Sequence, residues 1–255
     1  MRIPSLPSNL YKSSMANICQ RDARSEFLRV DGEALCGPVS VADILIHLAK
    51  THCPFLIEAQ GKLSEHEAWF KLIDQLATYM KTDEDGTTEE DLIEGFKRYV
   101  KDRDSSYKVT TFAQSYYAEE EGSILEVISD PRTIIPHIIG PSNTLLGVSF
   151  AEYIPNLDSY NLILSHYVAL AGFINNGSSC RFIIHDPSPG AKREPTICDL
   201  TPIKKGTLNG WCLNEKLDAT DFNQLHGLAI DKPEKDAGAN RVILDGMVSF
   251  AVERK

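Results

Sequence analysis

The chain lacks the features of a membrane or nucleic-acid-binding protein. No apolar run is long enough to span a membrane, and the segment from Met1 to Gln20 has no apolar signal-peptide core. The 26 basic residues are outnumbered by 36 acidic ones, which gives a net charge of −10. A nucleic-acid-binding surface needs clustered lysine and arginine, so we expect no nucleic-acid partner. The default location is cytoplasmic, and signal-independent export stays open.

The chain also lacks a disulfide framework and a zinc motif. Its six cysteines are scattered and form no CxxC pair. His47, His52 and Cys53 lie close together in the sequence but have no second ligand pair at zinc-finger spacing. We therefore expect no metal and no other cofactor, and we interpret five of the cysteines as reduced and structural.

Helical patterns come first along the chain and strand patterns later. Ser64 and Glu67 form a capping-box pattern, and Thr87 or Thr88 caps a further helix. From about residue 107 the sequence becomes rich in β-branched and aromatic residues, and Asn176-Gly177 is a strong hairpin signal. This segregation predicts an α+β fold, with a mainly helical half at about 36–130 and a mainly β half at about 140–255.

Cys36 lies where an amphipathic helix begins. Pro38 suits the first helical turn, and apolar residues follow at the helical spacing Val41, Ile44, Leu45 and Leu48. The dipole and the unpaired N–H groups of a helix N-terminus favour a thiolate. The sequence therefore indicates a candidate nucleophile at Cys36.

A thiol nucleophile needs a base and a third group that orients the base. Among seven histidines, His166 stands out because we expect it to open the apolar strand that runs from Tyr167. Across the predicted hairpin, the next strand ends at His185, and Asp186 should emerge near His166. Strand alternation should point His185 to the opposite face from Asp186.

These residues resemble one family. The motifs are Cys36-Gly37-Pro38 with Ser40, Ser165-His166-Tyr167-Val168 with Leu170 and Gly172, and His185-Asp186-Pro187. They are similar to motifs of the papain-fold cysteine peptidases related to bacteriocin-leader-processing peptidases. The resemblance covers most of residues 30 to 190, and it implies a single papain-like domain whose central helix packs on an antiparallel sheet.

The resemblance implies a catalytic role for each motif residue. Cys36 would be the nucleophile, His166 the base and Asp186 its orienting group. Family members also use an upstream glutamine as an oxyanion donor, and this role would fall to Gln20, the only glutamine before Cys36.

We expect a thiol hydrolase that acts on a peptide or protein substrate through a thioester. Peptidase activity is favoured, deamidase and acyl transferase activities remain open, and the oligomeric state is not readable from the sequence. The alternative is an inactive binding or effector module with the same residues. A membrane-linked leader peptidase domain is a weaker alternative, because the chain contains no transporter segment.

Overall fold

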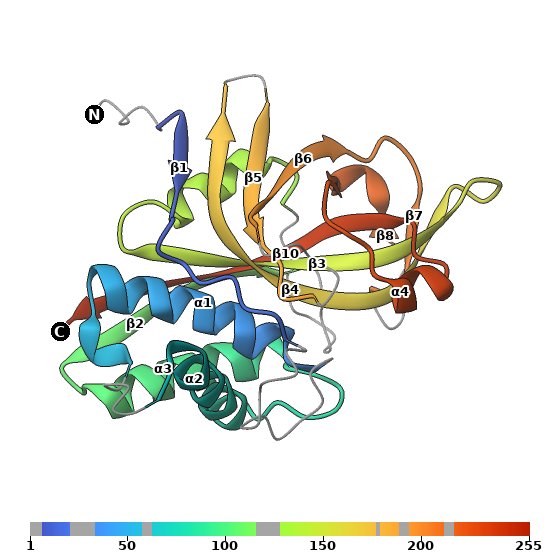
Figure 1. Ribbon diagram of the computed structural model, residues 1–255. Coiled ribbons are helices and arrows are strands. Elements are labelled where there is room, and N and C mark those ends of the chain that lie inside the picture. The colour runs from blue at the N-terminus through green and yellow to red at the C-terminus, as the bar shows by residue number, and fades with distance from the viewer. Residues whose placement is uncertain are drawn as a thin grey trace.

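The computed structural model describes residues 7–20, 34–57, 63–115, 128–176, 179–188, 194–211 and 217–255. Figure 1 labels the main elements. The α-helices are α1 (Cys36–Thr51), α2 (Glu65–Tyr79), α3 (Glu89–Arg103) and α4 (Lys232–Asp236), and the 3-10 helices are η2 (Pro54–Leu56), η3 (Pro131–His137) and η4 (Ala219–Asp221). The strands are β1 (Asn9–Tyr11), β2 (Tyr107–Ser115), β3 (Ser142–Ile154), β4 (Ser159–Asn175), β5 (Cys180–His185), β6 (Thr196–Pro202), β7 (Thr207–Asn209), β8 (Leu217–Asp218), β9 (Asn223–His226) and β10 (Arg241–Arg254).

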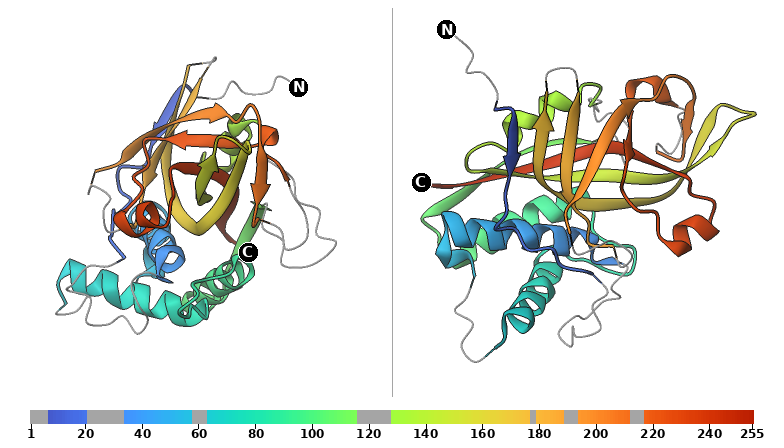
Figure 2. Two further views of the ribbon diagram at one scale, coloured as in Figure 1. Left: turned by 90° about the vertical axis from the view of Figure 1, so that its right-hand side faces the viewer. Right: turned by 45° about the horizontal axis from the view of Figure 1, so that its top comes forward.

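Six antiparallel strands close into a barrel. Around the ring β3 pairs with β4, β4 with β5, β5 with β6, β6 with β9, β9 with β10, and β10 with β3. Three of these ladders shift register, at Phe150/Ala151, at Leu170/Gly172 and at Leu244/Gly246. Such bulges bend a strand and increase its twist, which helps a sheet to curl and close. The left view of Figure 2 looks toward one end of this barrel.

The expectation of a papain-like α+β fold is wrong. The structure is a closed β-barrel with extra strands, and strands outnumber helices among the described residues. The sequence pattern identified some of the strands, such as β2 and β10, but could not show that the ring closes, because closure depends on pairings such as β9 with β10 and β3 with β10. An open sheet and a barrel have the same alternating pattern in sequence.

The apolar run of β4 is explained by burial on both faces. Val168 and Leu170 belong to the cluster that fills the barrel, whereas Ala169 and Ala171 belong to the cluster between the barrel and the helices. The helices α1, α2 and α3 lie together on this outer face (Figures 1 and 2). No helix in the described part of the chain is long and apolar enough to cross a membrane.

Local sequence signals set the helix boundaries. The predicted capping box is confirmed, since the Ser64 side chain accepts the Glu67 N–H and the Glu67 carboxylate accepts the Ser64 N–H. Thr88 rather than Thr87 caps α3, because its hydroxyl accepts the Asp91 N–H at 3.1 Å. These contacts fix where two of the three packed helices begin.

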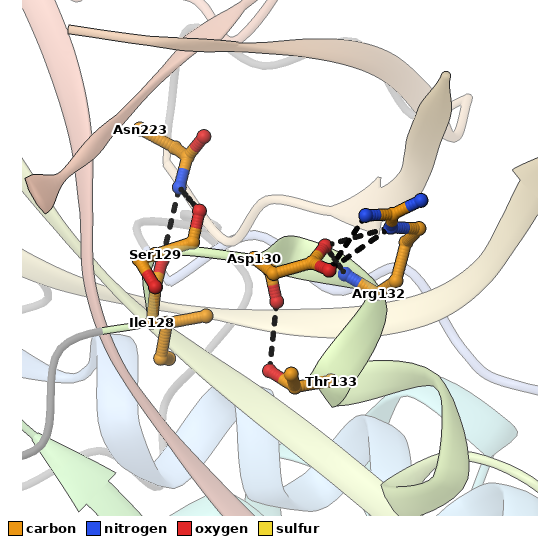
Figure 3. A network of polar contacts seen from close by, with 6 residues as sticks. All are labelled: Ile128, Ser129, Asp130, Arg132, Thr133 and Asn223. Carbon is orange, nitrogen blue, oxygen red and sulfur yellow. Dashed lines mark hydrogen bonds and ion pairs between the residues drawn. The ribbon is translucent and has the colours of Figure 1, made fainter. Parts of the chain in front are cut away.

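The helix η3 contributes to the core inside the barrel. Its residues Ile134 and Ile135 are buried in the barrel cluster. The Asp130 side chain caps η3 and pairs with Arg132, and the buried Asn223 side chain donates to the carbonyls of Ile128 and Ser129 (Figure 3). Asn223 on β9 thus ties the barrel wall to the chain that leads into η3.

An N-terminal arm, residues 7–20, crosses the outside of the barrel toward the end of β5. Its strand β1 pairs with β4, and the buried Lys12 amine donates to the side chain of Asn143 at 2.7 Å. Further along, the Ala16 carbonyl accepts a hydrogen bond from His185 Nδ1 at 2.7 Å. The arm is therefore anchored to the barrel at several points, from the pairing of β1 with β4 to the bond between Ala16 and His185.

The arm lies so close to β4 that Gly172 cannot be replaced without a shift. A Cβ atom at Gly172 would lie 2.1 Å from the Leu10 carbonyl oxygen. We expect Gly172→Ala to lower the free energy of unfolding by about 1–3 kcal/mol and to expose the arm to protease. Urea unfolding and limited proteolysis measure both effects. Ser165→Ala, at an exposed position of the same strand, is the control, and an equal effect of both variants would contradict the close approach.

Candidate active site

Cys36 is the first residue of α1. Leu35 at the N-cap forms no side-chain cap, so no side chain competes at this position for the first N–H groups of the helix. The Cys36 side chain is half-buried, and the N–H of Gly37 donates a hydrogen bond to its sulfur. A helix N-terminus thus presents its positive dipole end to the thiol.

The start of α1 meets β4 where that strand lacks strand partners on one side. On the side opposite β3, β4 pairs with β7 over 159–161 and with β5 over 169–175. Among the described residues, no strand pairs with positions 162–168 on this side. The Ser40 hydroxyl on α1 instead donates to the Tyr167 carbonyl at 3.0 Å. The interruption in the sheet therefore gives α1 access to His166 and Tyr167.

His166 connects the thiol to a carboxylate. Its ring forms a side-chain hydrogen bond with Cys36, and its Nε2 donates to Asp186 Oδ1 at 2.9 Å. His166 has a side-chain exposure of 6% and Asp186 one of 1%. The structure therefore brings together the three side chains that the sequence singled out, from α1, from β4 and from the turn after β5.

One detail of this prediction is wrong. His166 does not open its strand, because β4 begins at Ser159 and pairs with β3 on both sides of His166. The segment before His166, which includes Leu162, Ile163 and Leu164, was not recognised as part of the strand, and its pairing with β3 shows that it belongs to β4. The turn residues 177–178 of the predicted hairpin lie outside the described residues, although the register confirms antiparallel pairing of β4 and β5.

The electrostatics favour an ion pair between sulfur and imidazole. Burial would raise the pKa of Cys36, but the hydrogen bond and charge of His166, together with N–H donors from Tyr167 and Gly37, lower this pKa below its usual value. Burial would lower the pKa of His166, but its bonds to Asp186 and Cys36 raise it to about 10. Both shifts favour the thiolate and the protonated ring over the neutral pair.

Other thiols of the chain have the opposite electrostatic environment. Burial raises the pKa of Cys53, raises that of Cys180 to about 11 and raises that of Cys198 to about 12. All three are free cysteines, and none belongs to a described disulfide. Low thiol pKa values mark reactive cysteines, so Cys36 differs in kind from these three residues.

Gln20 lies at the end of the arm beside the turn that carries Asp186. It is buried, and its backbone N–H donates to the Pro187 carbonyl at 2.9 Å. The structure therefore brings the Gln20 backbone next to the residue that follows Asp186. His185 lies on the other face of β5, where it bonds to Ala16 of the arm instead of the Cys36 thiol.

Three contributors to the site were missed by the sequence reasoning. The Ser188 N–H donates to Asp186 Oδ1 at 2.9 Å, so the carboxylate is held from two directions. The Phe150 ring lies 5.7 Å from the His166 ring, centroid to centroid. Ser40 belonged to the first motif but had no role assigned, although its place one helical turn after Cys36 was a usable signal. Phe150 gave no such signal, because only the pairing of β3 with β4 brings it to His166.

Within the described residues, no group of three or more His, Cys, Asp or Glu side chains is arranged to hold a metal ion.

Comparison with known proteins adds nothing to the geometry of the site. The chain matches no protein-family model, and a search of curated proteins found no similar sequence. The chemistry of the site therefore has to be inferred from its own side chains.

Proposed function

We propose that this protein is a cysteine hydrolase that cleaves a peptide or carboxamide bond through a thioester intermediate. The observation that carries the proposal is the hydrogen-bonded series from Cys36 through His166 to Asp186. This order of nucleophile, base and orienting carboxylate recurs on unrelated folds, so the barrel does not argue against it.

The reaction would begin with attack of the Cys36 thiolate on the carbonyl carbon. The imidazolium of His166 would then give its proton to the leaving amine as the C–N bond breaks, which leaves a thioester and a neutral ring. A water molecule, deprotonated by the same ring, would attack the thioester, and cleavage of the C–S bond would release the acid and restore the Cys36 thiolate beside the His166 imidazolium. Asp186 would keep the ring oriented and stabilise its charged form in both steps.

The developing oxyanion would need N–H donors near Cys36. Backbone N–H groups at the start of α1 are candidates, since no side chain caps them at Leu35. The Gln20 side chain is a further candidate, because the arm carries this residue to the turn after Asp186. One such donor is worth about 3 kcal/mol of transition-state stabilisation.

The substrate class follows from the chemistry of the thioester. A peptide or protein amide would be hydrolysed, giving peptidase or deamidase activity. An amine acceptor in place of water would give acyl transfer from the same intermediate. No cofactor is required by any of these steps, because the nucleophile, the base and the acid are all protein side chains.

Selective alkylation tests the proposal. At about pH 6, where an ordinary thiol is almost wholly protonated, we expect iodoacetamide to label Cys36 about tenfold or more faster than Cys180. His166→Gln should remove this advantage, whereas His137→Gln, at a half-buried histidine away from the site, should keep it. Peptide mass spectrometry gives the rate for each cysteine.

Capture by a peptidyl vinyl sulfone distinguishes an enzyme from an inactive module. An active site should form a stable adduct at Cys36 that needs an intact His166. Labelling of Cys36 at the rate of Cys180, together with no vinyl sulfone adduct, would contradict the hydrolase proposal and favour the binding module.

A further inference from the structure

Ser40 lies one helical turn after Cys36 and faces the same strand. It is fully buried, with an exposure of 0%. Its hydroxyl donates to the Tyr167 carbonyl at 3.0 Å, although the two residues are 127 positions apart in the sequence. A buried hydroxyl in this position links the helix that carries the thiol to the strand that carries the imidazole.

The peptide groups of Tyr167 are available to α1 because of the interrupted sheet. In a β-strand the N–H and C=O of one residue point to the same side. The ladder between β4 and β5 ends at Ala169 and His185, two positions beyond Tyr167. The Tyr167 carbonyl accepts the Ser40 hydroxyl, and the Tyr167 N–H donates to the Cys36 sulfur. One residue of β4 thus bonds to α1 through both of its peptide groups.

We propose that Ser40 is a positioning residue that, by holding the Tyr167 carbonyl against α1, fixes the Tyr167 N–H on the Cys36 sulfur and His166 beside it. The inference rests on the proposed function and adds a residue to it. Without the hydroxyl, the Tyr167 peptide can turn away from α1, since no neighbouring strand in the described chain holds it at this point. The sulfur would then lose an N–H donor that stabilises its charged form.

The pH dependence of alkylation separates positioning from general stability. We expect Ser40→Ala to shift the midpoint of the iodoacetamide rate profile of Cys36 upward by about one pH unit, the effect of losing one hydrogen bond to a charged group. Capture by the vinyl sulfone should slow by about tenfold, because the sulfur and the ring are less well aligned. Both measurements use the full chain.

Ser249→Ala is the matched control. Ser249 is also a buried serine whose hydroxyl donates to a backbone carbonyl, that of His137, at 2.9 Å. We expect this variant to lose stability while its Cys36 profile stays that of the wild type. Ser40→Thr keeps the hydroxyl, so its Cys36 midpoint should lie close to that of the wild type and well below that of Ser40→Ala.

The outcomes separate the inference from the proposed function. If wild-type Cys36 reacts no faster than Cys180, the hydrolase proposal fails and the inference fails with it. If wild-type Cys36 reacts fast and Ser40→Ala leaves its profile unchanged, or if Ser249→Ala shifts it equally, only the inference is overturned. Should Ser40→Ala not melt cooperatively, Ser40→Cys offers a weaker donor of similar volume, and an upward shift of the Cys36 midpoint is expected there too.

Discussion

Replacement of Cys36 by alanine is expected to abolish covalent capture and to reduce turnover of a peptide or amide substrate by about 10⁴-fold or more. The thiol is the only group in the described site that can form the thioester, and the ring of His166 then has no sulfur to activate. The measurement is the rate of adduct formation, followed by the rate of hydrolysis of a substrate found in a peptide and amide screen.

The same variant should be almost as stable as the wild type. Cys36 is half-buried, and alanine is a good helix former in the first turn of α1. We expect a melting temperature within about 2 °C of the wild-type value. Cys53→Ala is the matched control, since it removes a buried thiol outside the site and should lower stability while leaving capture intact. Retained turnover in Cys36→Ala would exclude Cys36 as the nucleophile.

The second large effect concerns Asp186. We expect Asp186→Asn to lower the rate of capture and of turnover near neutral pH by about 10²- to 10⁴-fold. The carboxylate accepts the Nε2–H of His166 and thereby holds the ring toward Cys36. An amide in its place can present an N–H to the ring and favour the wrong tautomer. Asp199→Asn, at an exposed aspartate of β6, is the control and should leave both rates unchanged.

The pH dependence of the rate should also change in Asp186→Asn, and the direction of the change can be predicted. The bond to Asp186 helps to raise the pKa of His166 to about 10 against the effect of burial. Loss of the carboxylate lets the ring deprotonate at lower pH, so the alkaline limb of the rate profile should move to lower pH. An unchanged alkaline limb would show that Asp186 does not control the charge of the ring.

The free energy of unfolding should also depend on pH through the protonation of His166. A histidine whose folded pKa lies above its unfolded value of about 6.5 stabilises the fold fully below that pH and loses this contribution as the pH rises through about 10. The stability deficit of Asp186→Asn relative to the wild type should therefore be largest near pH 6.5 and should narrow toward about pH 10. Urea unfolding at several pH values measures this trend.

Local sequence signals were sufficient for much of the site. Pro38 and the apolar spacing after Cys36 predicted that a helix begins at the thiol, and α1 begins there. The hairpin between β4 and β5 predicted that Asp186 returns toward His166, because a short antiparallel connection places the end of one strand beside the earlier part of the other. Both signals act over a few residues, and tertiary packing did not override them.

The closed barrel and the meeting of α1 with β4 were decided only by tertiary structure. The barrel closes through β9, β10 and β3, whose pairings join positions far apart in the sequence and leave no periodic trace. The same is true of the contact between Ser40 and Tyr167 and of the Phe150 ring beside His166. Alternation records which face of a strand is buried, but it contains no information about which strand lies next to it. The sequence by itself therefore determined which side chains are the candidates for the proposed chemistry, and long-range strand pairing decided the fold that holds them together.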